Sequence, residues 1–299
     1  ISYINSFWFP IFNLANFYNS LLNAAAYIER IFETMDEKPS VTDNPGARLM
    51  PPITGLVEFV NVSFAYEEGE EILHEVSFTV QPGETIALVG PTGAGKTTIV
   101  NLISRFYDVT AGRVLIDGID LREVTLKSLR SQMGVMLQDT FIFSGTIMDN
   151  IRYSRLDATD EQVIAAAKAV KAHDFIEKME EGYYTQVNER GARLSVGERQ
   201  LISFTRALLA DPRILILDEA TSSIDTETEL LVQQGLERLL ANRTSFIIAH
   251  RLSTIKNADR IMYIDQGGIV EAGTHEELMK KRGVYYRLYL SQYQFLEVI

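Results

Sequence analysis

The sequence predicts an α/β fold built on a mainly parallel sheet, and three features carry this prediction. From Leu56 onward, short apolar runs alternate with helix-like segments, which is the pattern of strands joined by helical crossovers. A glycine-rich turn, GPTGAGKTT, lies between one such strand and a helix-like run. The segment 156–211 has the pattern of nearly continuous helix, so we expect a helical insertion within the sheet.

The expected strands are short, apolar and bounded by turn residues. They are LVEFVNVSFAY, ILHEVSFTV, TIALVG, RVLID, MGVML, RILILD, TSFIIA and RIMYID. We therefore expect one folded domain over residues 56–299, with its helical subdomain at about 139–212. Residues 39–55 are rich in Pro and Gly and are predicted to be a linker.

Residues 1–28 carry no charged side chain, and the first charge is that of Glu29. A helix of this length spans roughly 42 Å, more than the ~30 Å core of a bilayer. Its asparagines, at positions 5, 13, 16, 19 and 23, fall within an arc of roughly 120°. We predict a membrane span with one polar face, kinked at Pro10, and assign residues 1–38 to the end of a transmembrane domain. The alternative is an amphipathic helix that is buried in a partner or lies on the membrane surface, although surface helices usually carry Lys or Arg.

Composition excludes several classes of protein. The 299 residues include 28 basic and 40 acidic side chains, a net charge of −12, and no basic stripe is visible, so nucleic acid is not an expected partner. Cysteine is absent, which excludes disulfides and thiolate metal sites and fits a reducing cytosolic setting for most of the chain. The first residue is Ile1, without a signal-peptide layout, and we expect a piece of a longer chain.

The turn after TIALVG matches the phosphate-loop pattern G-x-x-x-x-G-K-[ST]. Backbone N–H groups of such a loop surround phosphates, and the helix that follows directs its positive end toward them. Lys96 is expected to neutralise β- and γ-phosphate oxygens, and the Thr97 hydroxyl to ligate Mg²⁺. The predicted cofactors are therefore ATP and Mg²⁺, and the predicted loop residues are Gly90, Pro91, Thr92, Gly93, Ala94, Gly95, Lys96, Thr97 and Thr98.

The run RILILDEA supplies two carboxylates at the end of a buried strand. Asp218 is expected to hold Mg²⁺ through a water molecule. Glu219 faces the other side by strand alternation and is expected to polarise the attacking water. The alternative, two solvated carboxylates, is disfavoured by the phosphate loop.

A second turn, LSVGERQ, also has the parts of an anion site. It offers the Ser195 hydroxyl and the Gly197 backbone directly before a helix-like run. A protein that binds one nucleotide needs only one such turn, so the second requires an explanation.

These motifs together resemble the nucleotide-binding domain of ATP-binding cassette (ABC) transporters. The resemblance rests on GPTGAGKTT, LSVGERQ, ILILDEATSSID and the histidine of FIIAHRL, and it covers about residues 56–299. The segments RIFETMDEKP, VMLQDTFIFSGTIMDNI and NERGARLSVGERQ resemble the exporter branch, of the multidrug or lipid type. The resemblance implies a P-loop NTPase fold with an antiparallel β subdomain and an inserted α-helical subdomain, preceded by the last transmembrane helix.

The resemblance also explains the second anion turn. In the family, two such domains face each other head to tail and enclose two ATP molecules. Each ATP lies between the phosphate loop of one domain and the signature turn of the other. Residues Ser195, Val196, Gly197 and Glu198 would then contact ATP bound to a partner domain, in a homodimer or a heterodimer.

Further roles follow from the resemblance alone. Tyr66 matches the aromatic residue that stacks on adenine; the less favoured alternative is an ordinary strand tyrosine. Gln138 matches the glutamine that reaches Mg²⁺ or the water and contacts the membrane helices. Asp225 matches the loop that contacts the opposite site, and His250 the histidine that contacts the γ-phosphate. The implied catalytic residues are Lys96, Gln138, Glu219 and His250, and the implied metal ligands are Thr97, Gln138 and Asp218.

The signature turn departs from the usual Leu-Ser-Gly-Gly-Gln. Val196 replaces a glycine and Glu198 replaces the glutamine. A carboxylate near ATP has an electrostatic cost, which leaves open how strong this half-site is.

The function that the resemblance implies is ATP-driven efflux of a drug, lipid or peptide. The protein would be a multi-pass protein of the cell membrane, with the cassette in the cytoplasm. The alternatives are a soluble ABC ATPase without transport, an importer ATPase subunit and a regulatory module without turnover. The charge-free residues 1–28 disfavour the first two, and the presence of Glu219 and His250 disfavours the third.

Overall fold

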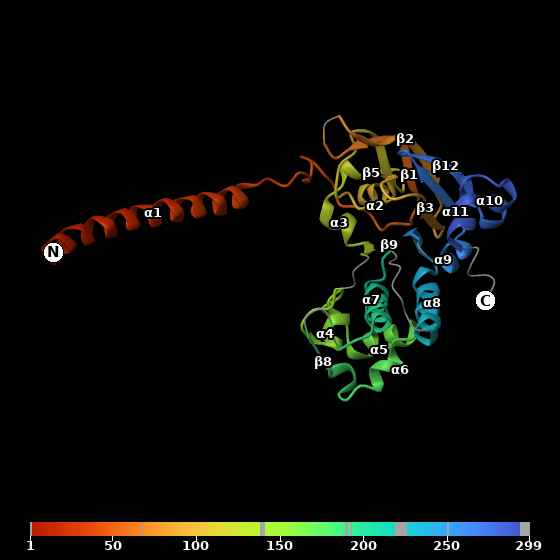
Figure 1. Cartoon of the computed structure of the whole chain (residues 1–299). Helices are drawn as coiled ribbons and strands as arrows, with labels where there is room; N and C mark the ends of the chain where they lie inside the picture. The colour runs from red at the N-terminus through yellow and green to blue at the C-terminus, as the bar shows by residue number, and fades with distance from the viewer. Residues whose placement is uncertain are drawn as a thin grey trace. The chain divides into compact units, whose positions relative to one another are not determined.

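A computed structural model of the chain describes residues 2–67, 69–137, 141–188, 191, 193–218, 226–249 and 251–293. The chain divides into two compact units, Ile1–Thr42 and Asp43–Ile299. Among the described residues, the first unit holds one helix, and the second holds the strands and the other helices (Figure 1).

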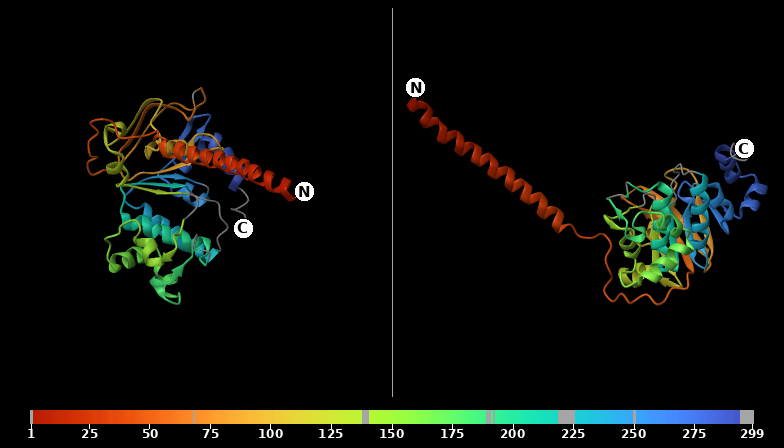
Figure 2. Two further views of the ribbon diagram at one scale, coloured as in Figure 1. Left: turned by 90° about the vertical axis from the view of Figure 1, so that its left-hand side faces the viewer. Right: turned by 90° about the horizontal axis from the view of Figure 1, so that it is seen from below.

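Helix α1 (Ser2–Asp36) forms as predicted and continues through Pro10 as a single helix (Figure 2). Within the described part of the chain, however, no helix is both long enough and apolar enough to cross a bilayer. The assignment of residues 1–38 to the end of a transmembrane domain stays a prediction.

A six-stranded sheet forms the centre of the second unit, in the order β12-β11-β3-β10-β9-β6. All neighbouring strands are parallel except the pair β11 and β12, so the predicted mainly parallel α/β sheet is confirmed. The strands are β3 (Thr85–Val89), β6 (Met133–Met136), β9 (Ile214–Asp218), β10 (Thr244–Ile248), β11 (Arg260–Asp265) and β12 (Gly268–Gly273).

A separate antiparallel sheet has the order β2-β1-β4-β5. Its strands are β1 (Val57–Ala65), β2 (Glu71–Val80), β4 (Ala111–Ile116) and β5 (Ile119–Asp120). Phe59 of β1 stacks on Phe78 of β2, with ring centroids 4.4 Å apart. One hydrophobic core joins this sheet to the central sheet through α2 (Lys96–Ile103), where Ile86, Leu88 and Ile99 are fully buried.

The helical part contains α4 (Ile147–Arg152), α5 (Asp160–Ala169), α6 (His173–Glu177) and α7 (Val196–Ala210), and α8 (Thr226–Leu240) packs against α7 (Figure 1). Capping boxes start three of these helices, at Thr146, Thr159 and Ser195. The segment 156–211 is less helical than predicted, because it also contains the turn η2 (Gly182–Tyr184) and β8 (Gln186–Val187), which pairs with β7 (Gly145–Thr146).

The remaining helices lie around the two larger sheets. They are η1 (Leu121–Glu123), α3 (Leu126–Arg130), α9 (Leu252–Asn257), α10 (His275–Lys281) and α11 (Val284–Tyr293).

The compact unit begins at Asp43, earlier than residue 56, where sequence analysis places the start of the folded domain. Both ends of the intervening segment are hydrogen-bonded to the domain. The Asp43 carboxylate accepts from the Leu126 N–H at 2.7 Å. The Asp117 carboxylate accepts from the N–H groups of Thr54, Gly55 and Leu56 at 2.6, 3.1 and 2.9 Å.

We expect Asp117→Ala to destabilise the second unit by about 1–3 kcal/mol, because several N–H groups lose a charged acceptor at once. Chemical denaturation followed by circular dichroism measures this loss. Asp157→Ala is the matched control, since Asp157 is exposed and makes no hydrogen bond within the described residues. Equal stability of the two variants would contradict a fastening role for Asp117.

Candidate nucleotide-binding site

Three neighbouring parallel strands end at one edge of the central sheet. Strand β10 lies between β3 and β9, and its Ile248 pairs with Leu88 of β3 on one side and Asp218 of β9 on the other. Asp218 is therefore level with a residue that lies two positions before the phosphate loop. Carboxyl edges of parallel sheets are the usual place for ligand sites in open α/β folds.

The phosphate loop runs from the end of β3 into α2, and its glycines have the backbone freedom that this turn requires. Gly90 has φ 142°, and a Cβ atom there would clash with the backbone carbonyl oxygen of Ile264. Gly95 has φ 105° and caps α2, where a Cβ would lie 2.7 Å from the Leu73 side chain. Larger residues at these positions would distort the loop.

Lys96 begins α2, and its side chain folds over the loop. Its Nζ donates to the carbonyl oxygens of Gly90 at 2.8 Å and Pro91 at 2.7 Å. Burial lowers the pKa of Lys96 below its usual value, and the nearby Asp218 carboxylate opposes this shift. The structure thus brings the lysine and the carboxylate into electrostatic contact, as expected for two parts of one site.

The other residues of the loop differ in their exposure to solvent. Pro91, Thr92, Gly93 and Thr97 are exposed, whereas Ala94, Gly95 and Thr98 are buried. Exposed backbone N–H groups at a helix start are the donors that a phosphate requires.

The residues expected to bind Mg²⁺ supply oxygen ligands from two elements, α2 and β9. The Thr97 hydroxyl is exposed in the first turn of α2, and the Asp218 carboxylate is half-buried at the end of β9. No cluster of three or more acidic, His or Cys side chains that could hold a metal exists among the described residues. A hydroxyl and one carboxylate fit Mg²⁺, which is usually held by few protein ligands together with phosphates and waters.

Tyr66 lies just after β1 and close to the first turns of α2. Its hydroxyl lies 3.3 Å from Thr98 Oγ1, and Asn101 Nδ2 donates to it at 3.5 Å. The ring meets Phe64 and Tyr107 edge to face, with centroids 4.8 and 5.0 Å away. The side chain is 46% exposed, so part of the ring can meet a base beside the phosphate loop.

The signature turn forms the start of α7. Ser195 Oγ accepts from the Glu198 N–H at 3.2 Å, and the Glu198 carboxylate accepts from the Ser195 N–H at 2.7 Å. Val196 is partly exposed and Gly197 is buried. The substituted carboxylate therefore serves as a helix cap, which also opposes the partial positive charge of the helix N-terminus.

The two anion turns occupy different parts of the same unit. Helix α2 lies beside the strands, whereas α7 lies among the helices α4, α5 and α6 (Figure 1). The structure thus brings together Tyr66, the loop at 90–98 and Asp218, and it places the turn at 195–198 elsewhere. Gln138, Glu219, Asp225 and His250 lie outside the described residues.

Sequence analysis missed a group of exposed aromatic side chains that follow Gln138 in the chain. Phe141, Phe143 and Tyr153 are 48%, 37% and 59% exposed. Phe143 lies within 4.9 Å of Phe141 and 4.5 Å of Tyr153, measured between ring centroids. Arg206 lies over the rings of Phe143 and Tyr153 and donates to the Asn150 carbonyl oxygen at 2.8 Å. The aromatic spacing in FIFSG, close to Gln138, was the available signal.

Comparison with known proteins matches residues 73–222 to the ABC transporter family. The chain is 55% identical over 291 residues to an uncharacterized ABC transporter ATP-binding protein, YknV, of Bacillus subtilis, covering 97% of this chain and 48% of that protein. It is 50% identical over 288 residues to a fatty acid ABC transporter ATP-binding/permease protein of Mycobacterium tuberculosis, covering 96% and 45%. It is 49% identical over 285 residues to an ATP-dependent lipid A-core flippase of Syntrophus aciditrophicus, covering 95% and 47%.

A solved structure of a bacterial Atm1-family ABC exporter with ATP bound is similar, with a TM-score of 0.82 and 41% identity. The alignment covers 92% of this chain and 48% of that one. The chain therefore belongs to the ABC transporter family, and it contains that family's ATP-binding domain. It spans about half the length of the curated relatives it matches.

Proposed function

We propose that this chain is the ATPase part of an exporter in which two cassettes share two ATP molecules. The observation that carries the proposal is the presence of two anion-binding helix starts, at α2 and α7, in different parts of one unit (Figure 1). The start of α2 offers backbone N–H groups and a partial positive charge to phosphates, and the start of α7 offers the Ser195 hydroxyl and the Gly197 N–H. A head-to-tail pair of chains uses both starts at each nucleotide.

Each group near the phosphate loop has a distinct part in this scheme. The loop N–H groups hold the phosphates, and Lys96 exchanges its contacts with the Gly90 and Pro91 carbonyl oxygens for phosphate oxygens. Thr97 and Asp218, with Gln138, would hold Mg²⁺, which neutralises charge on the β- and γ-phosphates when bound. Glu219 and His250 orient and activate the attacking water, and Tyr66 stacks on the base.

The partner side of the proposal is a second cassette and the membrane-spanning helices of the transporter. The exposed rings of Phe141, Phe143 and Tyr153, which follow Gln138 in the sequence, form an aromatic surface suited to receiving an apolar helix from the membrane domain. Several relatives are named as ATP-binding/permease proteins, which supports a membrane location with the cassette in the cytoplasm. Closure of the cassette pair would then drive efflux of a lipid, drug or peptide.

Ser195→Ala tests the shared site. We expect ATP turnover per molecule of the wild-type chain to rise with protein concentration, because the active species is a pair. The variant should turn over ATP about tenfold more slowly, since a hydrogen bond to a charged phosphate contributes about 1.5–3 kcal/mol. A steady-state phosphate-release assay at several protein concentrations measures both effects.

Ser195 also caps α7, so its removal costs helix stability as well as the phosphate contact. Thr159→Ala removes an equivalent capping box from α5 and is the matched control. Turnover that is independent of dilution and equal in the two variants would rule out the shared site.

A further inference from the structure

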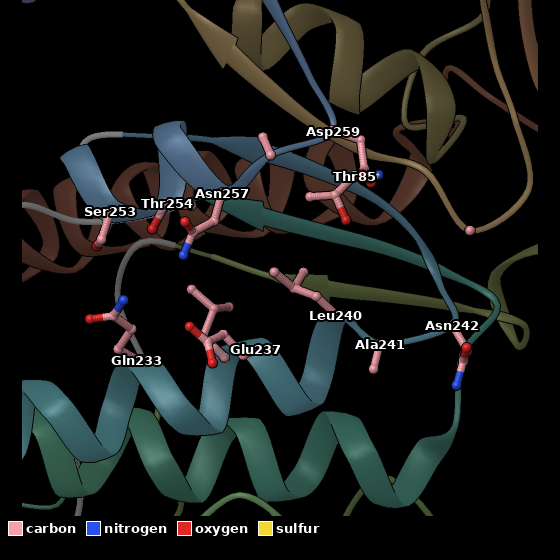
Figure 3. A pocket seen from close by; sticks show the side chains of 13 residues that line it. Thr85, Gln233, Glu237, Leu240, Ala241, Asn242, Ser253, Thr254, Asn257 and Asp259 are labelled. Carbon is pink, nitrogen blue, oxygen red and sulfur yellow. Dashed lines mark hydrogen bonds between the residues drawn. The ribbon is translucent and has the colours of Figure 1, made fainter. Parts of the chain in front are cut away.

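A cavity of about 290 Å³ lies near the amino ends of the sheet strands, whereas the phosphate loop follows the carboxyl end of β3. It is lined by residues of α8 and α9 and by residues next to the amino ends of β3, β10 and β11 (Figure 3). Its lining includes Thr85 at the start of β3 and Asn242, which precedes β10. The volume is close to the lower limit of small-molecule sites, about 300 Å³.

The charged side chains that line the cavity are acidic. Among the described residues, Glu237 and Asp259 are the two carboxylates that line it, and no described Lys, Arg or His does so. Asp259 Oδ2 accepts from the Thr85 N–H at 2.8 Å. Leu236, Leu240 and Ala258 supply apolar surface beside these groups. A ligand that fits this lining has a positive charge and a small apolar body.

Neutral polar side chains that line the cavity are also open to bonding. Gln233, Ser253 and Asn257 have no hydrogen-bond partner within the described part of the chain. Figure 3 shows Gln233 and Glu237 on α8 facing the α9 residues Ser253 and Asn257 across the cavity. A donor such as an ammonium group can therefore bond to both helices at once.

The same face of α8 already contacts the start of α9. Glu229 Oε1 pairs with Arg251 Nη1 at 3.0 Å, directly before α9. Gln233 and Glu237 follow Glu229 at four-residue steps, so all three lie on one face of the helix. A ligand in the cavity would add contacts between α8 and α9 beyond this ion pair, at the next two turns of α8.

We propose that this cavity is a binding site for a small organic cation, an ammonium group on a compact apolar body. Helix α8 follows the segment that contains Glu219 and Asp225, and α9 follows His250. A cation bound there contacts both helices and restrains movement between them. Slower ATP turnover is the expected consequence, and this part alone rests on the proposed function.

Phenethylamine is the probe, titrated calorimetrically into the 299-residue chain without nucleotide. We expect saturable binding, and about tenfold weaker binding of the neutral isostere 2-phenylethanol, because the alcohol lacks the charge that the lining carboxylates attract. Gln233→Arg should abolish phenethylamine binding, since the new guanidinium meets Glu237 one turn away. Gln234→Arg adds the same charge at the neighbouring exposed position and should bind as the wild type does.

Absence of saturable phenethylamine binding overturns the proposal, and so does equal binding of the amine and the alcohol or equal binding by the two Arg variants. Circular dichroism of both variants establishes that they fold. ATP turnover is then measured with saturating phenethylamine, and about a twofold decrease is expected in the wild type but not in Gln233→Arg. Binding without any change in turnover overturns the regulatory consequence and leaves the site itself established.

Discussion

Replacing Glu219 by Gln is expected to slow ATP turnover by a factor of about 100 to 10,000, the usual contribution of a general base. Glu219 directly follows Asp218, which lies at the carboxyl edge of the sheet, level with the end of β3. The substitution keeps the size of the side chain and removes its charge. ATP binding should persist, because the phosphate loop and Asp218 are unchanged.

Two assays separate the effects in Glu219→Gln. Single-turnover hydrolysis measures the chemical step, and equilibrium binding of a fluorescent ATP analogue measures affinity. Glu177→Gln makes the same chemical change at an exposed position on α6 and should leave both values unchanged. Hydrolysis by Glu219→Gln at the parental rate would show that another group activates the water.

Local sequence predicts the elements that make the phosphate site, because their signals are continuous in the chain. Strands β3 and β9 are buried on both faces and therefore appear as uninterrupted apolar runs, TIALV and ILILD. The loop that follows β3 combines its glycines with Lys96 within a few residues. The fold and the place of Lys96 and Asp218 could thus be predicted from the sequence.

Contacts between distant residues could not be predicted in this way. Pro and Gly made residues 39–55 look like a linker, yet Asp117 holds residues 54–56 to the domain from sixty or so positions away. Strand β12 is not among the strands expected from the sequence, and the partners of its Glu271 carboxylate lie in α11, outside the strand. That carboxylate is buried and accepts from the Val284 and Tyr285 N–H groups at 3.1 and 3.0 Å.

The signature turn contains the sequence signal of a capping box, which was instead interpreted as part of an ATP contact. Ser195 and Glu198 have the three-residue spacing of a capping box. Sequence analysis instead weighed the Glu198 carboxylate as a charge facing ATP. In the structure this carboxylate bonds to the Ser195 N–H, so its charge lies on the helix start itself.

Lys96→Ala is expected to weaken ATP binding by about 10- to 100-fold, because a hydrogen bond to a charged group contributes about 1.5–3 kcal/mol. Lys96 is the cationic side chain that the loop itself supplies, and its Nζ contacts the Gly90 and Pro91 carbonyl oxygens. Loss of the side chain leaves the β- and γ-phosphates with backbone donors alone. Turnover should fall at least as far as affinity does, since the same charge stabilises the transition state.

The measurement is a binding isotherm for ATP together with one for ADP. If Lys96 contacts both terminal phosphates, the loss of affinity should be larger for ATP than for ADP. Lys168→Ala is the matched control, an exposed lysine on α5 whose removal changes the net charge equally. A loss that is the same for Lys96→Ala and Lys168→Ala would reflect net charge only. Lys96 would then have only a structural role, bonding to the carbonyl oxygens of the loop, and would not contact the phosphates.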